Sequence, residues 1–305
     1  MSPIPNLTLN NGIKFPAIGH GSWSGTTPDK QAESLEWLKS ALKAGYRHID
    51  TAQDYQTEKY VGIAIRESGI PREEIFVTTK LPWNHHTRVA KSFQDSLEFL
   101  GIDYIDLYLM HWPQAVLYDE NNSQPTNPDG SLITTDHSFN DTWADIEKLL
   151  DTGKVRAIGV SNLSIKNLER LLKTAKVVPA VNQVELHPYL AQNDLLQFCQ
   201  EKGIILTAYA ATGYSYVRDD PLMVQLGKKY DVSPTQVTLA WHLARGTTAV
   251  PKSTNFERQK QNLTLPELNE EDIKRISGLD KNQRLCNKAD ELGKVWGWTY
   301  EQLGW

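Results

Sequence analysis

The 305-residue sequence contains few cysteines and no long apolar run, and both absences limit what the protein can be. Its two cysteines, Cys199 and Cys286, are too few for a disulfide-stapled secreted domain, so we expect free thiols in a reducing compartment. No stretch approaches the roughly 18 apolar residues that cross a bilayer. The N-terminus also lacks the basic start and apolar run of a signal peptide. We therefore expect a cytoplasmic protein that does not bind a membrane.

The sequence also lacks any block of like charge and any metal-binding motif. Lys and Arg total 32 against 37 Asp and Glu, which gives a formal net charge of -5 with no basic cluster. Nucleic acids and anionic membranes bind clustered cations, so we expect neither as a partner. His85 and His86 are adjacent in a predicted loop and would diverge, so we expect no metal site.

Short apolar runs alternate with segments of helical spacing along the whole chain. Eight strand-like runs lie at residues 17–20, 47–50, 76–79, 105–111, 155–160, 180–184, 204–208 and 248–251. The helical segments lie at residues 29–44, 58–68, 88–100, 139–152, 164–173, 192–202, 221–245 and 256–263. Asp29 is expected to cap the first helix and Gly45 to end it. Eight alternating β-α units favour a closed (β/α)8 barrel, the TIM barrel, over an open sheet.

No linker, repeat or low-complexity tract divides the chain, so we expect one domain over residues 1–305. Residues 7–15 predict an N-terminal β-hairpin with its turn at residues 10–12, which could plug the bottom of the barrel. The long segments 112–138 and 209–220 both follow strands. They should therefore lie at the C-terminal face of the barrel, where active sites form.

Four polar residues stand where predicted strands end: Asp50, Tyr55, Lys80 and His111. Each alone has an ordinary explanation, as a helix cap, a packed ring, a solvated charge or a buried structural histidine. Their strands are consecutive, and neighbouring strands lie about 4.8 Å apart, so the four should meet at one place. A buried lysine there would need a carboxylate, and Asp50 is the nearest candidate.

Such a group suits the reduction of a carbonyl compound, which needs a hydride and a proton for the developing alkoxide. A phenol has a pKa of about 10 and is a weak acid at neutral pH. We expect the Lys80 ammonium to lower the pKa of Tyr55 and so make it a better general acid. Asp50 would hold Lys80 in place. Neutral His111 would donate a hydrogen bond to the carbonyl oxygen.

At these residues the sequence resembles the aldo-keto reductases over nearly its whole length, in particular fungal-type aldehyde, aldose and glyceraldehyde reductases. The matching stretches are GYRHIDTA at 45–52 with Tyr55 and Glu58, TKL at 79–81, DLYLMHWP at 106–113, GKVR at 153–156, IGVSN at 158–162, NQVELHPY at 182–189 and PKS at 251–253. Their order and spacing together make the resemblance specific. It implies an NADP-dependent oxidoreductase acting on CH–OH groups, with Tyr55 as acid and NADPH as hydride source.

The resemblance also implies a binding site for NADP(H). Ser161, Asn162 and Gln183 match positions that bond the nicotinamide carboxamide, and Tyr209 matches the aromatic residue that stacks on the nicotinamide ring. The remaining matches are Lys252, Ser253 and Arg258 for the adenosine 2′-phosphate, Asn262 for adenine, and Gly21 with Ser22 near the cofactor. Two cations and a hydroxyl suit a phosphate, which favours NADP over NAD. A solvated basic turn is the alternative interpretation.

The substrate site implied by the resemblance has aromatic walls. Trp23, Trp83 and Trp112 all lie in loops beyond strand ends and suit a small carbonyl compound beside His111. Asp54 precedes Tyr55, as in the similar xylose reductases, and its carboxylate could accept hydrogen bonds from hydroxyl groups. We therefore favour polyhydroxylated aldehydes such as glyceraldehyde or an aldose.

The C-terminal tails of such proteins often border the substrate pocket, so the tail at residues 264–305 is expected to pack on the barrel and to do the same here. We expect a monomer or a weak homodimer.

Two other functions remain open at this level. The protein could bind NADPH as a regulatory or structural component with little turnover, although binding alone does not need an acid. It could also be a barrel glycosidase with Asp50 and Glu185 as its carboxylates, but this leaves Lys80 unexplained. Loss of nicotinamide absorbance on mixing with a carbonyl compound separates both from a reductase.

Overall fold

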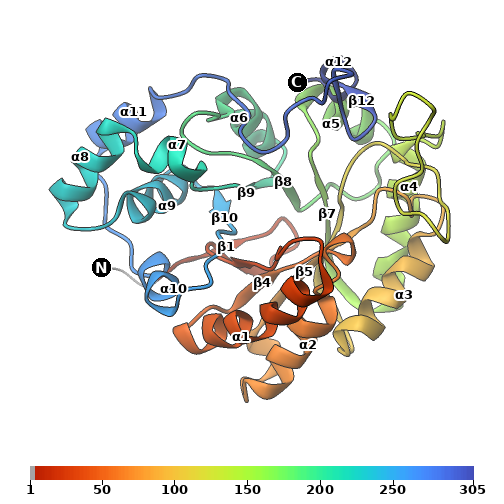
Figure 1. Ribbon diagram of the computed structural model, residues 1–305, viewed down its shortest axis with the longest axis horizontal. Coiled ribbons are helices and arrows are strands. Elements are labelled where there is room, and N and C mark those ends of the chain that lie inside the picture. The colour runs from red at the N-terminus through yellow and green to blue at the C-terminus, as the bar shows by residue number, and fades with distance from the viewer. Residues whose placement is uncertain (1–3) are drawn as a thin grey trace.

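A computed structural model describes residues 4–305 and contains a closed barrel of eight parallel strands (Figure 1). In chain order, which is also the order around the barrel, the strands are β3 (His20–Gly21), β4 (His48–Asp50), β5 (Phe76–Leu81), β6 (Ile105–Met110), β7 (Val155–Ser161), β8 (Val181–Glu185), β9 (Ile205–Tyr209) and β10 (Thr248–Ala249). Ile18 forms a parallel bridge with Ala249, which closes the last strand on the first. The predicted (β/α)8 barrel is confirmed.

Helices surround the barrel, as Figure 1 shows. The longer ones are α1 (Pro28–Ala44), α2 (Glu58–Glu67), α3 (Val89–Leu100), α4 (Phe139–Lys148), α5 (Ile165–Leu172), α6 (Asn193–Glu201), α8 (Pro221–Tyr230), α9 (Pro234–Ala244), α10 (Phe256–Asn262) and α11 (Glu270–Ser277). Short elements are α7 (Tyr214–Arg218), α12 (Tyr300–Leu303), η1 (Gln53–Tyr55), η2 (Arg72–Glu74) and η3 (Leu149–Thr152). Within residues 4–305, no helix combines the length and the apolar character needed to cross a membrane.

The N-terminal hairpin plugs one end of the barrel and packs against an apolar cluster there. Strands β1 (Asn6–Thr8) and β2 (Lys14–Pro16) pair antiparallel, as predicted. The ring of Phe15 lies 4.9 Å from that of Phe76, centroid to centroid, at the first residue of β5. Because parallel strands all start at one end, the hairpin covers the N-terminal end. The C-terminal ends of the strands are left for chemistry.

Two sequence predictions about helices are wrong. The helix expected at residues 221–245 is two helices, α8 and α9, because Asp231 adopts a left-handed conformation with φ 52° and ends α8. Ser233 then caps α9 through a capping box with Gln236. Asp29 does not cap α1 but lies inside its first turn, since Pro28 already occupies the first helical position after Thr27. Gly45 does end α1, at φ 115°.

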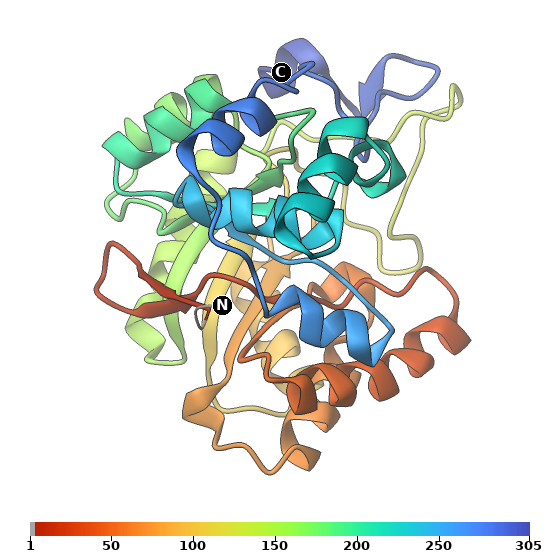
Figure 2. The same cartoon turned by 90° about the vertical axis from the view of Figure 1, so that its left-hand side faces the viewer.

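The C-terminal tail lies over the same end of the barrel as the long loop that follows β6 (Figure 2). The tail contains the two-stranded hairpin β11 (Lys294–Val295) and β12 (Trp298–Thr299). From the loop, Gln114 Nε2 donates to the carbonyls of Val295 and Trp296 at 3.1 and 3.3 Å. Both segments therefore border the C-terminal ends of the strands.

Candidate active site

The four predicted catalytic residues meet at the C-terminal end of the barrel. Asp50 ends β4, Lys80 lies near the end of β5, and His111 follows β6. Tyr55 ends the short helix η1 in the loop after β4. Each therefore projects from the same end of the sheet, as parallel strands require.

The centre of the group is a buried ion pair. Lys80 Nζ donates to Asp50 Oδ1 at 2.6 Å and to the carbonyl of Thr51 at 2.8 Å. Gln183 Nε2 donates to the other oxygen of Asp50, at 2.7 Å. Burial lowers the pKa of Lys80, and the Asp50 charge opposes that shift. Asp50 thus holds Lys80 in place and also joins it to a residue predicted to bind cofactor.

Tyr55 lies beside this pair, with its ring centroid 5.1 Å from Lys80 Nζ and 5.3 Å from the indole of Trp23. Burial raises the pKa of Tyr55 well above its ordinary value, and the charges of Asp50 and Asp54 raise it further. This direction runs against the lowering expected from Lys80. The physical reason is that Asp50 neutralises the ammonium at 2.6 Å, so the phenol experiences burial and carboxylates more than a free cation. Tyr55 is held in its protonated form.

His111 packs against Tyr55, with 5.7 Å between ring centroids. Its Nδ1 lies 3.1 Å from Asp54 Oδ2. Burial lowers the pKa of His111, while the hydrogen bond to Asp54 acts in the opposite direction. The lowered pKa favours a neutral His111 imidazole near pH 7.

The residues predicted for the nicotinamide carboxamide form one hydrogen-bonded network. Asn162 Nδ2 donates to the carbonyl of His111 at 3.0 Å, and the hydroxyl of Tyr209 donates to Asn162 Oδ1 at 2.6 Å. Ser161 Oγ donates to the carbonyl of Gln183 at 2.7 Å. Amide and hydroxyl groups of this kind match a carboxamide, which both donates and accepts. The donor set therefore fits the nicotinamide end of the cofactor.

The predicted phosphate residues follow β10. In the described chain, neither Lys252 nor Arg258 forms an ion pair with a carboxylate. Partial burial lowers the pKa of Lys252, and the nearby Lys30 lowers it further. Lys252 and Lys30 are thus neighbouring cations with no carboxylate partner among residues 4–305, and such an arrangement fits a phosphate group. His20 Nε2, 2.9 Å from the carbonyl of Ser253, fixes the segment to β3.

Three further residues predicted to bind the cofactor are buried or closely packed. Ser22 is fully buried, and its hydroxyl bonds Thr57 at 3.0 Å. Asn262 is buried beside Tyr46. Gly21 approaches the backbone closely, because a Cβ there would lie 3.0 Å from the carbonyl oxygen of Val250. Their contacts with a cofactor stay predictions.

An aromatic wall flanks the catalytic group, and it includes one residue that sequence reasoning did not single out. Trp83 and Trp112 are buried, whereas Trp23 is 46% exposed. Trp296, at the tip of the tail hairpin, stacks on Trp83 with centroids 4.8 Å apart and planes at 24°. Trp83 in turn stacks on His111 at 6.5 Å. The tryptophans of the tail indicated that it could contribute an aromatic ring to the pocket, but the sequence did not indicate which ring lies at the site.

Sequence reasoning also missed the link between the barrel and the tail. Glu185, at the end of β8, accepts hydrogen bonds from the backbone N–H groups of Cys286 at 2.9 Å and Asn287 at 3.2 Å. His187 Nε2 lies 3.1 Å from the same carboxylate. Asn287 Nδ2 donates to the hydroxyl of Tyr209 at 2.5 Å, so the tail reaches the carboxamide network. These contacts explain Glu185 without a glycosidase role.

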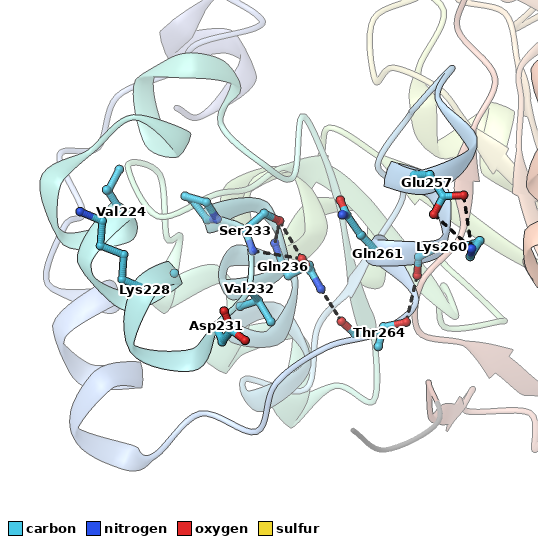
Figure 3. A pocket seen from close by; sticks show the side chains of 12 residues that line it. Val224, Lys228, Asp231, Val232, Ser233, Gln236, Glu257, Lys260, Gln261 and Thr264 are labelled. Atoms are coloured by element: carbon cyan, nitrogen blue, oxygen red, sulfur yellow. Dashed lines mark hydrogen bonds and ion pairs between the residues drawn. The ribbon is translucent and has the colours of Figure 1, made fainter.

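Two hollows of about 700 Å³ each lie away from this group. One separates the α8–α9 turn from α10 (Figure 3). Its lining mixes both charges, and Lys260 pairs with Glu257 at 3.1 Å within it. The other lies under the tail, beside the start of α6. Neither hollow contains a predicted catalytic residue, so the candidate site remains at the ends of the strands.

Comparison with known proteins agrees with this geometry. The family model described as "Aldo/keto reductase family" matches residues 17–281. The chain is 43% identical over 288 residues to a glycerol 2-dehydrogenase (NADP(+)) of Saccharomyces cerevisiae, covering 91% of each. It is 41% identical over 286 residues to an aldehyde reductase of the same organism, covering 90% of each. It is also 40% identical over 292 residues to a glyoxal reductase of Bacillus subtilis, covering 94% of the chain and 96% of that protein.

Proposed function

Because the chain belongs to the aldo/keto reductase family and is an NADP-dependent oxidoreductase, we propose that it reduces a small aldehyde or ketone with Tyr55 as general acid. The observation that supports this role is the position of a protonated phenol beside the buried Lys80–Asp50 pair. The glycosidase alternative leaves that pair without a purpose. Bound NADPH supplies the hydride to the carbonyl carbon.

The residues of the chain then have separate tasks. Tyr55 gives its proton to the alkoxide oxygen as the carbonyl is reduced, which is favourable because an alkoxide is a stronger base than a phenolate. The phenolate that forms is stabilised by the Lys80 ammonium, and Asp50 keeps that ammonium in place. Ser161, Asn162 and Gln183 would hold the carboxamide. Tyr209 would stack on the nicotinamide ring.

The preferred substrate in this proposal is a polyhydroxylated aldehyde such as glyceraldehyde or an aldose. Asp54 directly precedes the proposed acid Tyr55 in the chain, and its carboxylate lies 3.1 Å from His111 Nδ1. Aromatic rings line the site, and sugars present both hydroxyls and apolar C–H faces. Similar proteins carry the names glycerol 2-dehydrogenase and glyoxal reductase, which fits small oxygenated substrates. Arg258 and Lys252 favour NADPH over NADH as the reductant.

We further propose that residues 1–305 form one domain in a monomer or weak homodimer of the cytoplasm. The tail from residue 264 packs on the barrel through contacts of α11 with α8 and α9.

The decisive experiment compares the wild type with Tyr55→Phe. Rapid mixing of the wild-type NADPH complex with glyceraldehyde should bleach the nicotinamide absorbance. Removal of the phenol hydroxyl should lower kcat by about 10²- to 10⁴-fold, the usual contribution of general acid catalysis. The affinity for NADPH should change little.

Near-normal turnover of Tyr55→Phe would remove Tyr55 from the role of acid. A wild-type complex that binds NADPH but reduces no member of a broad carbonyl panel would instead indicate a binding protein with little turnover.

A further inference from the structure

The hollow under the tail is lined by none of the residues predicted to bind substrate or cofactor. Its volume is about 700 Å³, within the range of sites for small organic ligands. The barrel side of the lining comes from the starts of α5 and α6, at residues 164–165 and 192–195. The other side comes from the tail, at residues 280, 282–284, 300, 304 and 305. A ligand bound there would contact no predicted catalytic residue.

Arg284 is an uncommitted hydrogen-bond donor in this hollow. Its guanidinium carbon lies 3.4 Å from the centroid of the Trp305 ring. Within residues 4–305, the guanidinium forms no ion pair and no hydrogen bond, unlike the other arginines that the barrel and helices engage. Burial lowers the pKa of Arg284, and the charge of Glu185 offsets only part of that shift. Because a guanidinium stacked on an indole keeps its N–H groups at its edges, they remain available to a ligand.

Hydrogen-bond acceptors line the same hollow. Asp194, exposed in the first turn of α6, has no hydrogen bond to its carboxylate in the described part of the chain. One oxygen of Asp280 accepts from the backbone N–H groups of Ala191 at 3.3 Å and Asn282 at 3.0 Å, which leaves its second oxygen. Gln192 donates through Nε2 to a backbone carbonyl at 2.7 Å, which leaves Oε1. The hollow therefore offers acceptors from three side chains opposite the donor Arg284.

This combination selects one class of small molecule. The carboxylates of Asp194 and Asp280 disfavour an anion, and the guanidinium of Arg284 disfavours a cation. A hydroxyl group both donates and accepts, so several hydroxyls on one molecule can satisfy donors and acceptors together. The rings of Tyr300 and Trp305, 5.9 Å apart between centroids, add apolar surface on which the C–H groups of a sugar can pack.

We propose that the hollow under the tail is a second binding site, separate from the catalytic group, for a neutral polyhydroxylated compound such as a sugar or sugar alcohol. Binding there requires no proton from Tyr55, so this proposal does not depend on the proposed function. A protein that reduced no carbonyl compound would still bind the ligand.

A ligand in this site would also link the tail to the barrel. The tail already rests on α5, because Asn167 Nδ2 donates to the carbonyl of Leu303 at 3.0 Å, next to α12 and α5 in Figure 1. Directly after Arg284, the backbone N–H groups of Cys286 and Asn287 bond Glu185. A bound sugar would add contacts between these two points of attachment.

Fluorine NMR of protein labelled with 5-fluorotryptophan reads the site directly. The probes are sorbitol and trehalose, which have no free carbonyl group, and no cofactor is added. The signal of Trp305, assigned as the one missing from Trp305→Phe, should shift with at least one probe and saturate with a Kd on the order of 1 mM, as a few matched hydrogen bonds provide. Trimethylamine N-oxide, an osmolyte without hydroxyl groups, should leave it unchanged.

Three results of this titration would overturn the proposal. The first is no shift of Trp305 with either probe. The second is a shift confined to the rings of Trp83 and Trp296, which would place the sugar beside the catalytic group. The third is a Trp305 signal that saturates with sodium sulfate at a lower concentration than with either probe, which would indicate an anion site at Arg284.

Two variants test the donor and the acceptor separately. Arg284→Leu removes the guanidinium, and Asp194→Ala removes a carboxylate on α6 without altering the tail. Each should raise the Kd of the bound probe about 3- to 30-fold. Glu201→Ala, at an exposed glutamate at the other end of α6, is the matched control and should keep the wild-type Kd. If Arg284→Leu disturbs the fold of the tail, Asp194→Ala decides alone, and an unchanged Kd in that variant would contradict the proposal.

Discussion

Near the candidate site, the carboxyl group of Glu58 is buried, and its burial lowers the stability of the folded protein at neutral pH. Glu58, at the start of α2, accepts a hydrogen bond from Thr79 Oγ1 at 2.6 Å, but its other oxygen has no partner among the described residues. Burial raises the pKa of Glu58 to about 7, and the bond from Thr79 opposes that shift. An unfolded chain would titrate the same group near 4.3.

This difference predicts a loss of stability with rising pH. Between about pH 4 and pH 7 the unfolded chain releases the Glu58 proton while the folded protein keeps it, so the free energy of unfolding falls. The loss is complete above about pH 7 and amounts to roughly 3 kcal/mol. Glu58→Gln cannot titrate and should lack this fall when urea unfolding is compared at pH 5 and pH 8. Glu73→Gln, at an exposed glutamate, should behave like wild type; an equal fall in Glu58→Gln would assign the loss to other groups.

The preference for NADPH over NADH can also be tested at a single residue, Arg258. It is exposed on α10 and forms no ion pair within residues 4–305, so its charge is available to a 2′-phosphate. Arg258→Ala should raise the Kd for NADPH about 10- to 100-fold, the effect of one charge-assisted hydrogen bond or two, and the Kd for NADH less than about twofold. Fluorescence titration measures both. Lys260→Ala, on the same helix but paired with Glu257, is the control; equal weakening of both cofactors by Arg258→Ala would exclude the phosphate contact.

At the scale of elements, the tail hairpin presents a tryptophan in an unfavourable backbone conformation. Trp296 and Gly297 connect β11 to β12 with φ of 48° and 89°. Turns with two positive φ values favour Asn-Gly, and a bulky residue in the left-handed region costs about 1 kcal/mol. Stacking on Trp83 offsets this cost and places the ring in the aromatic wall.

Trp296→Asn separates the turn from the wall. Asparagine suits the left-handed position, so the free energy of unfolding should change by less than about 1 kcal/mol, because relief of strain offsets the lost stacking. The kcat/KM for small aldehydes should fall about tenfold, since the ring no longer covers the site. Thermal unfolding and steady-state kinetics give the two values. A large loss of stability with unchanged kinetics would mean that Trp296 only supports the fold.

At the scale of the whole molecule, hydrogen bonds to the Glu185 carboxylate hold the tail against the barrel. Burial by itself would raise the pKa of Glu185, but hydrogen bonds from His187 and from the backbone of residues 285–287 outweigh it, so the pKa is lowered. The carboxylate is fully buried, and all its partners are donors. Such a carboxylate stabilises the folded state above its ordinary pKa, and that contribution is lost as the pH falls through the lowered value.

Glu185→Gln should loosen the tail while leaving the barrel intact. The NH₂ group of the new glutamine would face backbone N–H donors that now bond a carboxylate oxygen. The lost hydrogen bonds should lower the free energy of unfolding by about 1 to 3 kcal/mol. Hydrogen exchange at residues 285–287 should accelerate about tenfold or more at pH 7, while exchange in β5 and β6 should not change. Glu291→Gln, at an exposed glutamate of the same tail, is the matched control and should keep the wild-type exchange. Unchanged exchange at residues 285–287 in Glu185→Gln would mean that the tail is held by its apolar contacts.

Sequence alone determined the barrel and which of the predicted catalytic residues would lie at one end of it. The strand and helix periods are local, and once the strands are parallel and consecutive, topology brings Asp50, Lys80 and His111 to one end without further information. Tertiary structure alone decided how these residues interact. Asp54 meets His111 across 57 residues, and Gln183 meets Asp50 across 133.

The direction of the Tyr55 pKa shift followed from such contacts too, because burial and paired charges depend on packing that no local pattern encodes. The position of the tail also depends on tertiary contacts that no local pattern encodes. Its Trp-Gly turn has tryptophan where asparagine is usual, and its anchor, Glu185, lies about a hundred residues away in the chain.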